Sequence, residues 1–278
     1  IFDGLRLMTL ARVTDERLSI KEVINVVLSN YFLAVLTPGA SGGAIAQIMF
    51  MKRANVPVAK ATVIVFVRTI MSITFLILLV PFVLYNDAFL SEWMPPAVIA
   101  AVSVIFISIP VAVVLLMRTR YPEFWLVALT GKLSHDYRRK CFNNYYEFKK
   151  ASFIMGRHPL MILRAFIESG ISLLGIYATV PMFFLGMNIQ FDWLQVMGRM
   201  VLLNLVLYFS PTPGGSGIAE AGFIVLFASL LPEGMVGIMA VLWRFTAEYF
   251  PFLLGAFISI RAFGSNIIAA NNLKEREN

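Results

Sequence analysis

The chain is poor in charge, cysteine and histidine. Only 14% of its 278 residues are Asp, Glu, Lys or Arg, whereas 59% are hydrophobic, and this balance excludes an ordinary soluble domain. A single cysteine, Cys141, excludes a disulfide within the chain, and its place in the most basic stretch fits a reducing, cytoplasmic side. His135 and His158 share no metal-ligand spacing with Cys141. The sequence therefore predicts no metal site and no cofactor.

Apolar runs dominate what remains. The mean hydropathy is +0.80, and at roughly 20 residues per crossing the runs leave room for about six to eight crossings or half-crossings. We predict an all-α polytopic membrane protein with a single transmembrane domain over residues 1–278. Full spans are expected at 61–85, 96–117, 159–187 and 235–260.

A similar sequence motif occurs twice between apolar runs, as TPGASGG at 37–43 and as PTPGGSGIAE at 211–220. Proline removes a backbone donor and clustered glycines permit positive φ, so a helix should break at both places. At membrane depth a broken backbone is tolerated where protein buries it or where it lines a wet cavity, so we predict one functional centre containing both motifs. The predicted helix breaks are Pro38, Pro211 and Pro213, and the predicted substrate-binding residues of the motifs are Gly39, Ser41, Gly42, Gly214, Gly215, Ser216 and Gly217.

Each motif would join two short helices. Helices at 20–36 and 41–51 would reach about 25 Å and about 17 Å, short of a bilayer core of roughly 30 Å. We therefore favour a re-entrant hairpin over two tilted spans. A second hairpin is predicted from 196–210 and 218–231.

The order of these elements predicts an inverted-topology repeat. The first hairpin would open to the cytoplasm and the second to the outside, and each precedes a span with an arginine in its first half. We place repeat 1 at about 20–117 and repeat 2 at about 159–262, and we expect residues 1–20 to form a cytoplasmic surface segment.

Residues 118–157 form the most basic segment. Interleaved aromatic residues predict amphipathic helices in the membrane interface, in contact with anionic lipid. Flanking spans argue against nucleic acid as the partner, despite a net charge of +7. By the positive-inside rule, this segment and the tail at 263–278 should be cytoplasmic, in a multi-pass protein of the cell (inner or plasma) membrane. The sequence leaves homo-oligomerisation open.

Charged residues inside the apolar runs are further candidates for substrate binding. Glu220 follows the second motif, and Arg244 on the last span is its expected partner, with Glu248 one turn beyond. A purely structural ion pair is the alternative. Arg68 has no partner in its own span, so it must pair across the repeats, face water or meet a ligand.

Helices beginning at Ser41 and Ser216 would point their N-termini into the interior. Unsatisfied N–H groups there would suit a phosphate, and with Arg68 and Arg244 they would make a site for a phospholipid headgroup. The alternative is that the serines cap the helices and the glycines permit tight packing.

These motifs resemble a flippase-like family related to the transmembrane region of lysylphosphatidylglycerol synthase, the multiple peptide resistance factor. The resemblance covers most of the chain and rests on LTPGASGG (36–43), KATVIVFVRTI (60–70), PTPGGSGIAEAG (211–222), Leu242 to Arg244 and Pro251 to Gly255. It implies a protein that moves a phospholipid between leaflets, including an aminoacylated one such as lysyl-phosphatidylglycerol. The soluble aminoacyl-transferase domain of the full synthases is absent from the sequence, so enzymatic lipid synthesis is not implied.

Two other functions stay open at this point. One is an accessory membrane scaffold that organises a lipid- or glycan-modifying enzyme through residues 118–157. The other is a membrane-embedded lipid-phosphate transferase, although the sequence contains no recognisable catalytic constellation.

Overall fold

The computed structural model describes residues 1–93, 97, 100, 101, 104, 108, 119, 121–130 and 135–262, and the regular elements in these ranges are helices. Most of the predicted span at 96–117 and the tail at 263–278 lie outside the described residues. The first half contains α1 (Phe2–Val13), α2 (Ile20–Leu36), α3 (Ser41–Arg53), α4 (Val58–Asn86) and α5 (Ala88–Trp93).

The second half begins with two helices in the basic segment and continues with the apolar ones. Its elements are α7 (Tyr121–Thr130), α8 (His135–Gly156), α9 (Pro159–Tyr177), α10 (Thr179–Gly186), α11 (Trp193–Tyr208), α12 (Ile218–Phe227), the 3-10 turn η1 (Ala228–Leu230), α13 (Met235–Arg244) and the π-helical turn η2 (Phe245–Tyr249). Helical backbone then continues to residue 262. Because π turns often occur at functional sites, the position of η2 directs attention to Arg244 and Glu248.

Helix α1 is buried, so the prediction of a surface segment at residues 1–20 is wrong for this helix. Leu7, Leu10 and Ala11 are fully buried, and α1 packs against α9, α2 and α4. The hydroxyl of Thr9 donates a hydrogen bond to the buried carboxylate of Glu168 on α9 at 2.8 Å. The polar residues of α1 suggested an exposed helix, but Asp3, Arg6 and Thr9 are buried and have hydrogen-bond partners.

Three long helices could span a membrane among the described residues. They cover Val58–Leu84, Pro159–Gly186 and Met235–Ala262, so long apolar helices are present where spans were predicted, at 61–85, 159–187 and 235–260. The hairpin helices α2 and α3 have 17 and 13 residues, so they reach about 25 Å and about 20 Å. Each is shorter than a bilayer core of roughly 30 Å.

A capping box fixes the start of α2. The backbone N–H of Glu22 donates to the Ser19 hydroxyl at 3.3 Å, and the Glu22 carboxylate accepts from the Ser19 N–H at 2.7 Å. The helix therefore begins at Ile20, as predicted, and ends where Thr37 and Pro38 leave the helical conformation.

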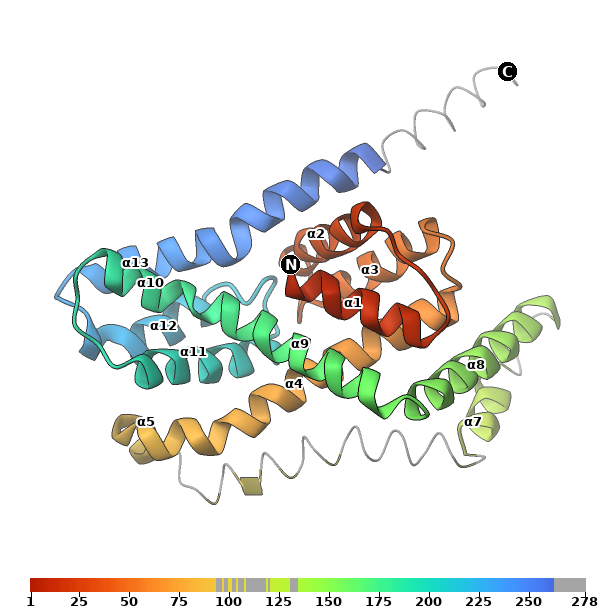
Figure 1. The fold of residues 1–278 in the computed structure, drawn as a ribbon, viewed down its shortest axis with the longest axis horizontal. Helices are drawn as coiled ribbons and strands as arrows, with labels where there is room; N and C mark the ends of the chain where they lie inside the picture. The colour runs from red at the N-terminus through yellow and green to blue at the C-terminus, as the bar shows by residue number, and fades with distance from the viewer. Residues whose placement is uncertain are drawn as a thin grey trace.

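The two hairpins lie in opposite halves of the molecule (Figure 1). Helices α2 and α3 are in one half, α11 and α12 are in the other, and α4 and α9 run between them. The loops at the hairpin tips meet, since Pro38 and Pro213 form an isolated antiparallel bridge. One hydrophobic core surrounds each hairpin, with Leu10 and Ile64 in one core and Phe223 and Trp243 in the other.

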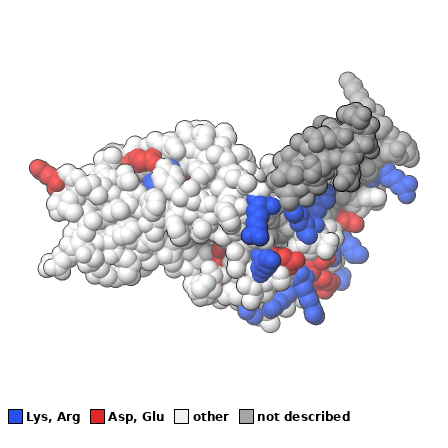
Figure 2. All heavy atoms as spheres, turned by 90° about the horizontal axis from the view of Figure 1, so that it is seen from above, with Lys and Arg blue, Asp and Glu red and all other residues white. Residues whose placement is uncertain are grey.

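Charge is concentrated at one end of the molecule. In Figure 2 most of the lysines and arginines that are visible gather at the right-hand end, whereas the rest of the visible surface is largely uncharged. Aromatic residues on α7 and α8 are exposed there, including Trp125, Tyr137 and Phe153. Lys149 of α8 pairs with Glu123 of α7 at 2.8 Å, and this contact raises the pKa of Lys149.

Candidate functional site

The two motifs have the same backbone conformation at corresponding positions. Gly39 and Ala40 have φ angles of 60° and 53°, and Gly214 and Gly215 have φ angles of 58° and 68°. Only glycine adopts this left-handed region without strain. A Cβ on Gly214 would also lie 3.2 Å from the carbonyl oxygen of Val35, so glycine lets the second motif approach the end of α2.

Helix α3 begins at Ser41 and α12 begins at Ile218, as predicted for the two hairpins. The start at Ser216, which the hypothesis of a phosphate site required, is wrong. The physical reason is that Gly215 and Gly217 both have positive φ, which interrupts the helical path around Ser216.

Local acceptors already satisfy the N–H groups at these helix starts. The Gly42 N–H donates to the hydroxyl of Thr37 at 2.8 Å, and the Gly217 N–H donates to the carboxylate of Glu220 at 2.6 Å. The Ser41 and Ser216 N–H groups donate to the carbonyls of Pro38 and Pro213. The prediction of unsatisfied N–H groups for a phosphate is therefore wrong at these positions, because side chains and carbonyl groups of the motifs supply the acceptors.

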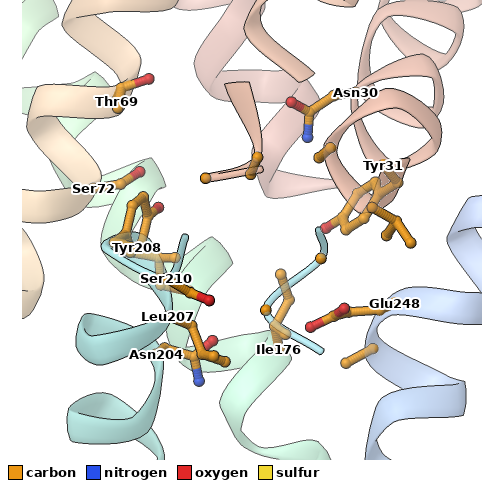
Figure 3. Close-up of a pocket in the computed structure, with 18 of the residues that line it drawn as sticks. Asn30, Tyr31, Thr69, Ser72, Ile176, Asn204, Leu207, Tyr208, Ser210 and Glu248 are labelled. Atoms are coloured by element: carbon orange, nitrogen blue, oxygen red, sulfur yellow. The ribbon is translucent and has the colours of Figure 1, made fainter. Parts of the chain in front are cut away.

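A cavity of about 450 Å³ lies between the two hairpin tips. Residues from α1, α2, α3, α4, α9, α11, α13 and η2 line it together with both motifs. Figure 3 shows polar side chains around it, with Thr69, Ser72 and Tyr208 on one side and Tyr31 and Glu248 on the other. Charged and polar side chains in a cavity inside an apolar helix bundle are unusual, since polar groups at membrane depth are costly unless water, ligands or partners solvate them.

Arg68 pairs across the cavity wall with Asp3 of α1. Its Nη2 lies 2.9 Å from each carboxylate oxygen of Asp3, and its Nε lies 3.1 Å from Oδ1. Arg6 also pairs with Asp3 and donates to the hydroxyls of Ser72 at 2.7 Å and Ser169 at 3.0 Å. All three charged residues line the cavity.

Arg244 holds the second motif to the last span. Its Nε donates to Glu220 at 2.9 Å, its Nη1 pairs with Glu248, and its Nη2 donates to the carbonyl of Gly214 at 2.9 Å. The predicted pairing of Arg244 with Glu220 and Glu248 is confirmed. Arg244 itself is only 1% exposed.

The structure brings part of the predicted substrate-binding set to the cavity. The residues that line it are Gly39, Ser41, Arg68, Gly214, Gly215 and Glu248. The other predicted residues are not in the lining, namely Gly42, Ser216, Gly217, Glu220 and Arg244, together with the helix-break residues Pro38, Pro211 and Pro213. These residues form the hairpin tips or, like Arg244, contact them.

Several lining residues escaped the sequence analysis. Asp3 and Arg6 lie in the segment assigned to the surface, while Asn30, Tyr31, Asn204 and Tyr208 look like ordinary polar interruptions of apolar helices. Asn30 and Asn204 occupy similar places in the two hairpins, seven and eight residues before Thr37 and Thr212. This symmetric placement is the feature of the sequence from which Asn30 and Asn204 could have been predicted.

Comparison with known proteins settles the family. The family described as "Lysylphosphatidylglycerol synthase TM region" matches residues 1–255. The chain belongs to this family. The expected resemblance is thereby confirmed, and the motif-bearing hairpins and the cavity between them all lie within the matched region.

A distant relative of this family member comes from Archaeoglobus fulgidus. This "UPF0104 membrane protein" is 19% identical over 266 residues, which covers 91% of the present chain and 80% of the relative. No solved structure matches the chain.

Proposed function

We propose that this protein is a membrane lipid transporter that moves a phospholipid, including an aminoacylated one such as lysyl-phosphatidylglycerol, between the two leaflets. The observation that carries the proposal is the charged and polar cavity between the hairpin tips of an apolar helix bundle. A headgroup would occupy the cavity while its acyl chains stay in the bilayer. We propose a transporter rather than an enzyme.

An inverted-topology repeat is part of this proposal. It is supported by the similar φ angles of Gly39 and Ala40 in the first motif and Gly214 and Gly215 in the second, and by the pairing of Pro38 with Pro213. In transporters built from inverted repeats, the substrate site lies at the repeat interface near the bilayer midplane, where the helices are discontinuous. Rocking of one repeat against the other would expose the cavity to each side in turn.

The basic end of the molecule gives the proposed orientation. Lysines and arginines gather there (Figure 2), and by the positive-inside rule this end would face the cytoplasm. Exposed aromatic residues of α7 and α8 would lie in the headgroup region of an anionic lipid surface.

Leaflet exchange in proteoliposomes tests the proposal. Acyl-labelled phosphatidylglycerol, lysyl-phosphatidylglycerol and a neutral diacylglycerol would be followed by quenching of the outer leaflet, with protein-free liposomes as background. Protein-dependent exchange of phospholipid is the expected result. Equal rates with and without protein, in the presence and absence of a proton gradient, would contradict it.

A matched pair of variants connects the exchange to the cavity. Ala44 on α3 lines the cavity, and the adjacent Ile45 is exposed on the outer face of the same helix. Ala44→Phe should lower exchange by about tenfold or more because the ring occupies headgroup space, whereas Ile45→Phe adds a ring outside and should leave exchange near the original rate. Thermal unfolding of both variants checks that each is folded.

A further inference from the structure

The charges around the cavity do not balance locally. On one side, Arg6 and Arg68 share the single carboxylate of Asp3, so one positive charge is in excess. All three residues line the cavity, and their side chains are at most 15% exposed. Their charge is therefore weakly screened by bulk water and acts on whatever occupies the cavity.

The other side of the cavity has the opposite excess. Arg244 is shared by Glu220 and Glu248, which leaves one negative charge unbalanced. Of these three residues only Glu248 lines the cavity, and its side chain is 22% exposed. Figure 3 shows the Glu248 carboxylate pointing into the cavity from the side opposite Ser72, the residue to which Arg6 donates.

Two buried donors of the cavity lining also lack an acceptor among the described residues. They are the Nε–H of Arg6 and the Nε1–H of Trp243, and both residues line the cavity and are 2% exposed. Buried donors are nearly always satisfied in native proteins, so their presence indicates a missing acceptor. A phosphate has several acceptor oxygens, and one of them could accept from the Nε–H of Arg6 on the cationic side.

We infer that the cavity binds a headgroup with one phosphate and one ammonium group and no net charge. The phosphate lies toward Arg6 and Arg68, and the ammonium lies toward Glu248. This inference rests on the proposed function and names its substrate class. Phosphatidylethanolamine has this chemistry, whereas phosphatidylglycerol lacks the cation and lysyl-phosphatidylglycerol has two.

The balance of charge predicts an order among these lipids. Without an ammonium group, phosphatidylglycerol leaves the excess negative charge of Glu220, Arg244 and Glu248 unbalanced in a partly desolvated site, which disfavours its binding. The second ammonium of lysyl-phosphatidylglycerol has no matching carboxylate, since Glu220 lies outside the lining. Phosphatidylethanolamine should therefore exchange fastest.

The experiment measures the exchange rates of these three lipids in proteoliposomes of fixed composition. It is done with the unchanged protein, with Glu248→Gln and with the control variant Glu233→Gln. Glu233 lies exposed in the turn between η1 and α13, so its variant removes the same charge away from the cavity. Loss of the Glu248 charge should slow phosphatidylethanolamine exchange by about tenfold or more, because one charge contact at short range in a partly dry site has at least this effect. Glu233→Gln should retain the original rates.

Binding of soluble headgroups separates this inference from the transport proposal. Thermal unfolding in detergent would be measured with glycerophosphoethanolamine, glycerophosphoglycerol and inorganic phosphate. Stabilisation by glycerophosphoethanolamine above the other two, lost in Glu248→Gln, supports the inference even if no lipid exchanges. In that case the transport proposal alone fails.

Three results would overturn the inference. They are equal exchange of all three lipids, fastest exchange of phosphatidylglycerol or lysyl-phosphatidylglycerol, and an unchanged lipid order in Glu248→Gln. The transport proposal survives each of these three results. Absence of both exchange and headgroup-dependent stabilisation would overturn both proposals.

Discussion

Arg199 on α11 is surrounded by groups that satisfy its charge. Its Nε donates to Asp87 at 2.7 Å, and its Nη1 donates to the hydroxyl of Ser229 at 3.1 Å and to the carbonyl of Leu226. The guanidinium also lies over the ring of Phe89, with 4.8 Å from Cζ to the ring centroid. Arg199 thus connects α11 to the end of α4 and to the end of α12.

Replacement of Arg199 should therefore make the folded protein less stable. Arg199→Met leaves the buried carboxylate of Asp87 without a counter-charge, which should lower the free energy of unfolding by about 3–5 kcal/mol. The double variant Arg199→Met/Asp87→Asn removes both charges and should recover part of the loss. Unfolding in mixed detergent and SDS micelles measures both effects. A double variant no more stable than Arg199→Met would show that the ion pair is not the cause.

Sequence reasoning at the residue scale worked where partners are close in the chain. Glu248 is one turn from Arg244, and Glu220 begins the preceding helix, so their pairing could be anticipated. The partner of Arg68 could not, because Asp3 lies 65 positions away on a helix assigned to the surface. Charge along a helix was taken as a sign of exposure, although a buried carboxylate is stable when two arginines share it.

The last span packs unusually closely on α2. A Cβ on Gly255 would lie 2.0 Å from the carbonyl oxygen of Leu28 and 3.1 Å from the Cβ of Phe32. Small residues at helix contacts of membrane proteins permit this kind of backbone approach. The position of Glu248, two turns earlier on the same span, depends on that contact.

Gly255→Ala should separate the span from α2. We expect a loss of about 1–3 kcal/mol in stability, as for overpacking of a close contact, together with slower lipid exchange. Gly237 lies on the same span, and a Cβ there would meet nothing within 4 Å. Gly237→Ala should gain about 0.5–1 kcal/mol from higher helix propensity. Thermal unfolding of the two variants compares them directly, and equal stabilities would argue against the close packing.

Prediction at the scale of elements was accurate for long apolar helices and less so at their ends. The three described spans follow from length and hydropathy alone. Two starts were predicted for the second hairpin helix, Ser216 and Ile218, and α12 begins at Ile218 because three glycines with positive φ, Gly214, Gly215 and Gly217, unwind the chain before it. Composition indicates that such a string breaks a helix, but it does not indicate which glycine ends the irregular stretch.

At the scale of the whole molecule, the meeting of the two tips restricts the topology. Each hairpin is too short to cross a bilayer core of roughly 30 Å, yet the tips touch at Pro38 and Pro213. Two short hairpins that enter from opposite faces would meet near mid-depth. Two hairpins that enter from the same face would have their open ends on that one face. Figure 1 does not favour this arrangement, because the two hairpins extend from their tips into opposite halves of the molecule.

Cysteine labelling measures this arrangement. In a Cys141→Ser background, Lys52→Cys marks the end of the first hairpin and Glu233→Cys marks the turn after the second; both positions are exposed. An impermeant maleimide should label Glu233→Cys in intact cells, and it should label Lys52→Cys only after the membrane is permeabilised. Labelling of both from one side would exclude hairpins of opposite orientation. The cavity would then not lie between two oppositely oriented halves. The structure would no longer support a mechanism in which the headgroup is exposed to each side in turn.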